Sequence, residues 1–414
     1  MPEPRSPDAS ATTTPSRPRA GLVATYREVL AAPGATRLAV ASLVSKWPIS
    51  MFPVSTLLLV SPAYSYARAG AVVAAMLLAN AASSPARGRQ IARRGARVVL
   101  RICLAGYLAG LTGIAVAAAS SAPFPVVLTA AALMGAFFPP ASILLRSHWT
   151  AVDRGRGHSS ANALESALMD LSLITGPILA SWLSTYVTPV LPLALIGVLM
   201  TLAVALLSGL PDQRPPSSPP PGRSRRSRRS RRLLRTPLVG LFGAQFLFCA
   251  ALAATEVSLP VYAQQQNAAA YSGWLLAGLS VGSIVGALVL GRLPGSGATR
   301  LPVLLVLLAA GMCAIGGAMF LGPVAVAAAS VPAGLAIGSV FARFFTVLGA
   351  ATPPGVDHEV QGWANSMTTV GFAAGSFGGA ALADALGTPA LLLCSPLAAV
   401  VAACLAAWSA SAKA

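Results

Sequence analysis

Long uncharged stretches dominate the pattern of hydrophobic and polar positions along this chain. Residues 102–145, 171–211, 257–291 and 301–342 contain no Asp, Glu, Lys or Arg. A single membrane-spanning helix needs about 20 apolar residues, so each stretch is long enough for two spans joined by an uncharged turn. The apolar residues run continuously instead of alternating with polar ones, which favours helices over the strands of a β-barrel.

Shorter apolar stretches between isolated charges bring the expected number of membrane helices to twelve. The sequence therefore predicts an all-α polytopic membrane protein. The expected spans are 38–61, 69–87, 98–119, 124–145, 162–186, 189–210, 238–262, 271–291, 301–321, 324–347, 362–384 and 388–410.

The composition excludes the common soluble classes. Charged residues make up 10% of the chain and hydrophobic residues 55%, whereas a soluble domain carries about 25% charged residues. So few charges cannot cover the surface of a soluble protein of 414 residues. The hydrophobic content is also too high for a fully disordered chain.

Basic residues gather on one side of the expected helices. The chain has 29 Lys and Arg against 11 Asp and Glu, a formal net charge of +18. Nearly all of the basic residues lie before the first span, after the last one or in loops of one face, while Arg68 lies on the other face and Lys46 inside a span. Cytoplasmic loops carry such an excess of Lys and Arg. We therefore expect a protein of the cell membrane with both termini in the cytoplasm.

A basic linker divides the chain into two halves. Residues 211–236 read PDQRPPSSPPPGRSRRSRRSRRLLRT and cannot build a packed core. The expected units are a disordered basic tail at 1–36, six helices at 37–210, this linker, and six helices at 237–411. We expect this cytoplasmic basic segment to lie against anionic lipid of the inner leaflet, which attracts Lys and Arg side chains. Nucleic acid is the alternative partner, but the linker lacks the interleaved aromatic residues that stack on bases, so we expect none.

The segment after the second expected span, GRQIARRGAR, resembles the loop signature GxLADRxGRK of the major facilitator superfamily. Two positions depart from it, because Gln90 stands at the leucine and Ala92 at the acidic position. In that family the acid anchors the loop during the conformational switch, so the resemblance implies that this contact is weaker here or supplied elsewhere. The matching residues are Gly88, Arg93, Gly95 and Arg97.

The fifth expected span carries SLITGPILAS, which resembles the antiporter signature GxxxGPxxGG and keeps Gly176 and Pro177. Three further strings, YREVLAAPGATRLAVASLVSKWPISM, NALESALMDLSLITGP and TEVSLPVYA, are similar to those of an actinobacterial-type branch of the superfamily. Ala131 stands where drug antiporters carry an Arg, and the sugar-porter string PESPR is absent, so no substrate subfamily is indicated. The resemblance implies two six-helix bundles, alternating access and efflux of a small molecule.

Ionisable groups inside the spans are the candidates for coupling transport to protons. Such a group costs about 2.5–3.5 kcal/mol on insertion scales and is a functional candidate by default. Asp170 lies too deep in its span to act as a helix cap, whereas Glu165 lies where it would also complement the helix dipole. Glu256 lies in the outer half of its span, where Arg68 is the one basic residue on that side, and loss of water favours the neutral form of a carboxyl group. A water-filled vestibule is the alternative surrounding for Glu256.

Side chains near the middle of the spans are candidates for a substrate pocket or a gate. Lys46 lies eight residues into the first expected span beside Trp47, and it could instead extend its stem to the membrane surface. Phe138 is a further pocket candidate, and Gly176 with Pro177 would shape the fifth span.

Arg343 is the gate candidate of the second half. It could hold the loop acids Asp357 and Glu359, or it could reach the membrane surface from a helix end. Asp384, at the outer end of the eleventh span, is expected to cap a helix or to face solvent.

The leading hypothesis is a secondary transporter that exports a small molecule in exchange for H⁺ and acts as a monomer. A non-transporting sensor or scaffold of the same fold, or a facilitative or uptake carrier, is the alternative. An intramembrane enzyme is not supported, because none of the 3 His lies well inside an expected span and no P-loop is present. We expect no cofactor, and the His residues show no metal-ligand spacing.

Overall fold

The computed structural model describes residues 35–141, 144–145, 159–209, 238–290, 300–352 and 357–411. Within these ranges the chain forms twelve α-helices and a short 3-10 helix, η1, and it has no strand. The first half contains α2 (Ala35–Val60), α3 (Tyr66–Arg94), α4 (Ala96–Ala119), α5 (Phe124–Ala136), α7 (Ser159–Tyr186) and α8 (Leu191–Ser208). The second half contains α10 (Leu238–Gln265), η1 (Ala269–Tyr271), α11 (Ser272–Leu290), α12 (Leu301–Met319), α13 (Pro323–Ala351), α14 (Asp357–Leu386) and α15 (Thr388–Ser411). The predicted all-α fold is confirmed.

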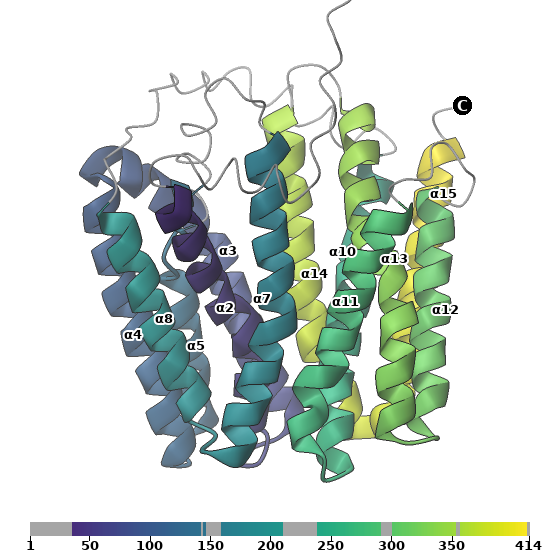
Figure 1. Cartoon of the computed structure of the whole chain (residues 1–414), viewed down its shortest axis with the longest axis horizontal. Helices are drawn as coiled ribbons and strands as arrows, with labels where there is room; N and C mark the ends of the chain where they lie inside the picture. The colour runs from purple at the N-terminus through teal and green to yellow at the C-terminus, as the bar shows by residue number, and fades with distance from the viewer. Residues whose placement is uncertain are drawn as a thin grey trace, which may run out of the picture.

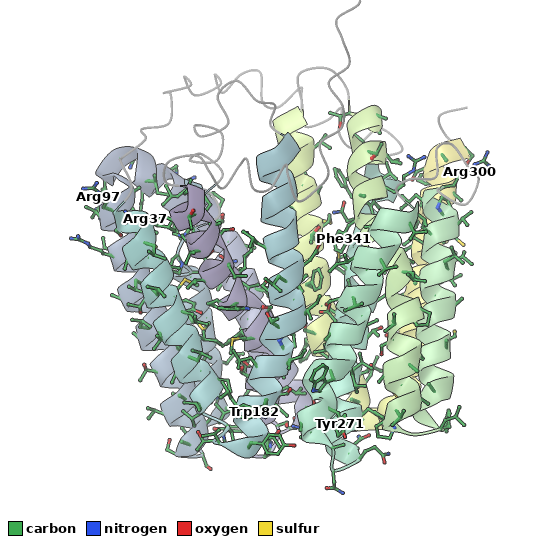
Figure 2. All side chains as sticks on the ribbon, in the orientation of Figure 1. Arg37, Arg97, Trp182, Tyr271, Arg300 and Phe341 are labelled. Carbon is green, nitrogen blue, oxygen red and sulfur yellow. The ribbon has the colours of Figure 1, made fainter. Side chains whose placement is uncertain are left out.

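Two bundles of six helices stand side by side along a common direction (Figure 1). The helices α2 to α8 form the first bundle and α10 to α15 form the second. The chain enters α2 and leaves α15 at the same end of the molecule (Figure 1). Arg37, Arg97 and Arg300 lie at this end, called the basic end, whereas Trp182 and Tyr271 lie at the other, called the opposite end (Figure 2).

The surface of the bundles is suited to lipid. Ten helices of the described ranges are long and apolar enough to cross a membrane, and Phe124–Ala136 is a shorter apolar helix. Large apolar side chains, among them Val116, Val198 and Leu397, are exposed. A soluble monomer rarely exposes so many large apolar side chains. The chain is therefore a multi-pass integral membrane protein.

The interior combines large buried rings with close backbone contacts. Phe248 packs its ring against Phe344 of α13 in the second bundle, with centroids 5.8 Å apart. Gly286 lets α11 approach α13, because a Cβ there would overlap the Leu335 carbonyl oxygen. Small residues at helix contacts serve this purpose in membrane proteins, where lipid supplies no hydrophobic drive for helix association.

The helix α5 ends earlier than the sequence predicted. It stops at Ala136 and residues 137–140 are not helical, so the expected span over 124–145 is not uninterrupted, although residues 141, 144 and 145 are helical again. Pro139 and Pro140 follow within four residues. Proline lacks the N–H that a helix needs and disfavours helical geometry in the residue before it, so the chain leaves the helix here.

Candidate functional site between the two bundles

The two bundles meet through three sets of helices. The helix α3 packs against α14, α7 packs against α11 and η1, and α2 contacts α10. Accordingly, α7, α14 and α11 occupy the middle of the molecule (Figure 1). The side chains of these helices therefore line the interface between the two bundles.

Gly176 of α7 and Gly273 of α11 let α7 contact one helix of each bundle. A Cβ at Gly176 would overlap Ser50 Oγ of α2 in the same bundle. A Cβ at Gly273 of α11 would overlap the Pro177 carbonyl oxygen and the Ile178 Cα. Glycine at both places therefore allows an approach that any larger residue would prevent.

Pro177 also frees a backbone acceptor of α7. Proline has no N–H, so the carbonyl of Leu173, four residues earlier, lacks its intrahelical hydrogen bond. Ser280 Oγ of α11 lies 3.4 Å from this oxygen and 3.3 Å from Leu276 O of its own helix. The Ser280 hydroxyl can thus donate across the interface to a carbonyl that the proline has left open.

Further hydrogen bonds join the bundles at the opposite end. Ser61 Oγ, just after α2, donates to Gln264 Oε1 of α10 at 3.2 Å. The Gly273 N–H donates to Ser181 Oγ of α7 at 3.1 Å, and the Ser181 hydroxyl lies 3.4 Å from Ala270 O of η1. These contacts close the opposite end of the interface.

Asp384 adds a carboxylate to this closed end. The Tyr66 N–H of α3 donates to Asp384 Oδ1 at 3.1 Å, and the Ala67 N–H donates to Oδ2 at 2.6 Å. The sequence predicted that Asp384 would cap a helix or face solvent. The structure shows both, because the side chain is exposed and also caps a helix. That helix belongs to the other bundle, which the sequence did not indicate.

The helices α2 and α7 bring several predicted residues together. Lys46 is 7% exposed on α2, and Trp47 Nε1 donates to Thr175 Oγ1 of α7 at 2.8 Å. Asp170 is half-buried on α7, five residues before Thr175 and so about 7.5 Å nearer the basic end. Lys46 and Trp47 therefore lie beside the segment of α7 that carries Asp170 and Gly176.

Glu256 lies apart from these residues, on the second bundle. It is half-buried on α10, in the half of the helix nearer the opposite end. Among the described residues of this bundle, the basic ones are Arg300 and Arg343. Arg300 lies at the basic end (Figure 2), and Arg343 lies eight residues before the end of α13, which runs from the opposite end to the basic end. Arg68, at the opposite end, holds its guanidinium over the Phe124 ring, 5.4 Å from the centroid. No described basic residue of its own bundle therefore shares this half of the membrane with Glu256.

Gln245 is a polar residue of α10 that sequence reasoning missed. It is 1% exposed, and its Nε2 donates to Thr368 Oγ1 of α14 at 2.8 Å. Its Oε1 has no hydrogen-bond partner. A search for charged residues passes over it, and the available signal was one Gln in the apolar run LFGAQFLF.

Phe138 packs within the first bundle. Its ring meets the Tyr107 ring edge to face, with centroids 5.6 Å apart. Its carbonyl oxygen accepts a hydrogen bond from Arg87, a 6% exposed residue of α3 that also donates to Asn80 Oδ1 at 2.5 Å. Arg87 thus ties α3 to the segment where α5 breaks off, and the pocket role of Phe138 stays a prediction.

The loop signature lies at the basic end. Gly88 belongs to α3, and Arg93 and Arg97 are exposed. Gly95 joins α3 to α4 with a φ of 83°, a conformation that favours glycine. Its N–H donates to Ile91 O at 3.0 Å and so closes the end of α3.

The remaining candidates are only partly described. Arg343 is half-buried on α13, and its Nε has no hydrogen-bond partner. Glu165 belongs to α7, but its side chain lies outside the described residues, as do the side chains of Asp357 and Glu359. Among the residues that the structure describes, no three His, Cys, Asp or Glu side chains gather as metal ligands.

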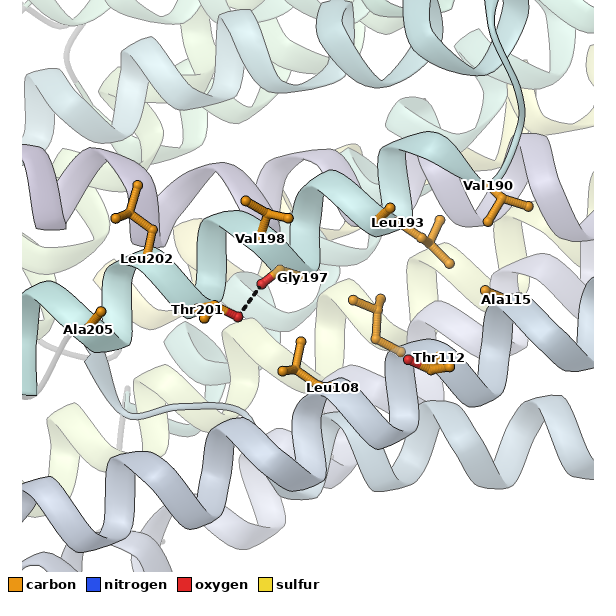
Figure 3. Close-up of a pocket in the computed structure, with 12 residues that line it drawn as sticks. Leu108, Thr112, Ala115, Val190, Leu193, Gly197, Val198, Thr201, Leu202 and Ala205 are labelled. Carbon is orange, nitrogen blue, oxygen red and sulfur yellow. Dashed lines mark hydrogen bonds between the residues drawn. The ribbon is translucent and has the colours of Figure 1, made fainter.

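A separate groove of about 630 Å³ lies between α4 and α8 of the first bundle (Figure 3). Apolar side chains such as Leu108, Val198 and Leu202 line it, and the Thr201 hydroxyl donates to Gly197 O at 2.8 Å. It contains no charged group. None of the predicted coupling, pocket or gate residues lines this groove.

Comparison with known proteins decides the family. Residues 38–376 match the sequence model of the Major Facilitator Superfamily. The chain belongs to this superfamily. A search of curated proteins finds no match to this major facilitator.

Solved structures share the fold of this major facilitator at low sequence identity. A variant of the nucleoside transporter NupG superposes with a TM-score of 0.71 and 14% identity, over 92% of this chain and 99% of that one. The D-xylose-proton symporter gives 0.67 and 12%, over 90% and 96% of the two chains. A variant of the peptide transporter POT in complex with alafosfalin gives 0.67 and 13%, over 93% and 98%. As a major facilitator, the protein is a secondary transporter of small molecules.

Proposed function

We propose that this facilitator exports a small molecule in exchange for protons. The proposal rests on one observation, which is that each bundle carries a half-buried carboxyl group inside a helix of the interface, Asp170 on α7 and Glu256 on α10. An ionisable group is costly at this depth and is a functional candidate by default. A carboxyl group in a partly dry setting can bind a proton and release it again when water returns.

Orientation follows from the basic end. Arg37, Arg97 and Arg300 lie there (Figure 2), and cytoplasmic ends of membrane helices carry such an excess of basic residues. We therefore assign the basic end to the cytoplasm of the cell membrane. The antiporter-like Gly176 and Pro177 favour export over uptake. The small number of charged groups that the described residues place between the bundles favours a neutral or amphipathic substrate.

The proposed cycle uses the closed opposite end as its starting point. Substrate enters from the cytoplasm while the hydrogen bonds of Ser61, Ser181 and Asp384 hold the opposite end closed. Rocking of the bundles breaks these contacts, releases the substrate outside and exposes Glu256 to protons. The protonated protein returns and releases its proton toward the cytoplasm through Asp170.

Uphill flux in proteoliposomes tests this proposal. A resistance screen with neutral and amphipathic toxic compounds, in cells with and without the gene, first supplies a substrate. Vesicles with an acidic interior should then accumulate this substrate above its external concentration, because antiport exchanges internal protons for external substrate whichever way the protein is inserted. A fall of the internal substrate concentration below the external one would instead show symport. A substrate flux that does not change with the pH gradient would show a facilitative carrier.

A further inference from the structure

The start of α3 leaves two backbone donors that its own bundle does not satisfy. Ser65 is the N-cap in extended geometry, and its side chain accepts the Arg68 N–H at 3.2 Å. The Ala69 N–H reaches Ser65 O at 3.0 Å. The first N–H groups of a helix have no intrahelical acceptor, so those of Tyr66 and Ala67 depend on another partner.

Asp384 of the second bundle supplies that partner. Its two carboxylate oxygens each accept one of these N–H groups, at 3.1 Å from Tyr66 N and 2.6 Å from Ala67 N. The negative charge also sits at the positive end of the α3 dipole. Asp384 lies two residues before the end of α14 at Leu386, where a carboxylate is unfavourable for its own helix. The favourable electrostatic partner of Asp384 is therefore α3.

A row of small residues on α14 brings the carboxylate within reach. Ser376, Ala380 and Asp384 follow one another at intervals of four, so they share one face of the helix. On α3, a Cβ at Gly70 would lie 2.5 Å from Ser376 O and 2.6 Å from the Ala380 Cβ. The two backbones thus touch one turn from the α3 N-terminus, which allows the short Asp side chain to span the remaining gap.

We infer that Asp384 is a positioning residue of the transport cycle, which holds the opposite end closed by capping the N-terminus of α3 from the other bundle. Opening of this end must separate α14 from α3 and transfer the Tyr66 and Ala67 N–H groups to water. Loss of the carboxylate should therefore favour the open state. The inference does not depend on proton coupling or on the direction of transport.

Distance measurements between the bundles test this role. Spin labels are attached at Val187→Cys and Leu321→Cys in a variant without native cysteines; these positions lie at the opposite end of the two bundles and are 53% and 81% exposed. Double electron–electron resonance on the purified full chain then reports the fraction of molecules open at this end. A helix cap contributes about 1 kcal/mol, so Asp384→Ala should raise the ratio of open to closed molecules about five-fold. Asp384→Asn, which keeps one acceptor and loses the charge, should give a smaller rise.

Ser65→Ala is the matched control. It removes a cap at the same helix end but no contact between the bundles, so the open fraction should stay at the value of the unmodified chain. An unchanged distance distribution in Asp384→Ala, or an equal change in Ser65→Ala, would overturn the inference. A lower melting temperature of Asp384→Ala without a change in distances would assign it a purely structural role and overturn the inference as well.

Discussion

Glu256→Gln should abolish the accumulation of substrate in vesicles with an acidic interior, while exchange of labelled for unlabelled substrate continues. Glutamine keeps the size and hydrogen bonding of the side chain but cannot bind or release a proton. Exchange needs no net movement of protons, so a folded transporter without its proton carrier still performs it. Parallel measurement of the two fluxes in the same proteoliposomes separates loss of coupling from loss of folding.

Two companion variants sharpen this test. Asp170→Asn removes the second carboxyl group of the interface and should also uncouple the flux. Asp8→Asn removes a carboxyl group from the segment that precedes α2 in the sequence and should leave both fluxes unchanged. Normal gradient-driven accumulation in both Glu256→Gln and Asp170→Asn would refute the proton role of these residues.

Gly273→Val should stop transport by preventing closure of the opposite end. A Cβ at this position would lie 2.5 Å from Ser181 Oγ and would overlap the α7 backbone at Pro177 and Ile178. Overpacking of this kind costs about 1–3 kcal/mol, which shifts an equilibrium between two states about 5- to 150-fold. The open state avoids the clash, so the spin labels at positions 187 and 321 should report a predominantly open molecule with little substrate flux.

Gly317→Val is the control for this substitution. Gly317 also lies in a membrane helix, but a Cβ there would meet nothing within 4 Å. The same change of residue should therefore leave flux and distances unaltered. If Gly273→Val transports at the rate of the unmodified chain, the contact of α7 with α11 is not part of the gate.

Much of the fold could be predicted because it depends on local composition. Uncharged runs such as 102–145 and 301–342 are long enough for two spans each, and the structure places α4 with α5 and α12 with α13 there. The exception is a break in the fourth span. The apolar content continues there, but residues 137–140, which include Pro139 and Pro140, leave the helix before residues 141, 144 and 145 are helical again. A hydropathy pattern does not detect the N–H that proline lacks.

The candidate site could be predicted only in part, because its contacts join distant segments. Gly176 and Pro177 could be recognised from their sequence pattern. The hydrogen bond from Ser280 of α11 to the free Leu173 carbonyl could not, because it depends on how α11 packs against α7. The sequence likewise indicated only that Asp384 lies at a helix end. Its neighbours in the sequence give no sign that it binds the N-terminus of α3, which is more than 300 residues away along the chain. The search inside the spans considered ionisable groups, aromatic rings and the Gly-Pro pattern but not uncharged polar side chains, so Gln245 was passed over.

The most direct test of proton-coupled export is the pH change that substrate itself evokes. Proteoliposomes in weak buffer, with equal pH on both sides, receive substrate outside while a pH electrode follows the medium. Antiport moves substrate inward and protons outward, so the medium should become more acidic, and Glu256→Gln should remove the response. A constant pH, or a medium that becomes more alkaline, would contradict proton exchange.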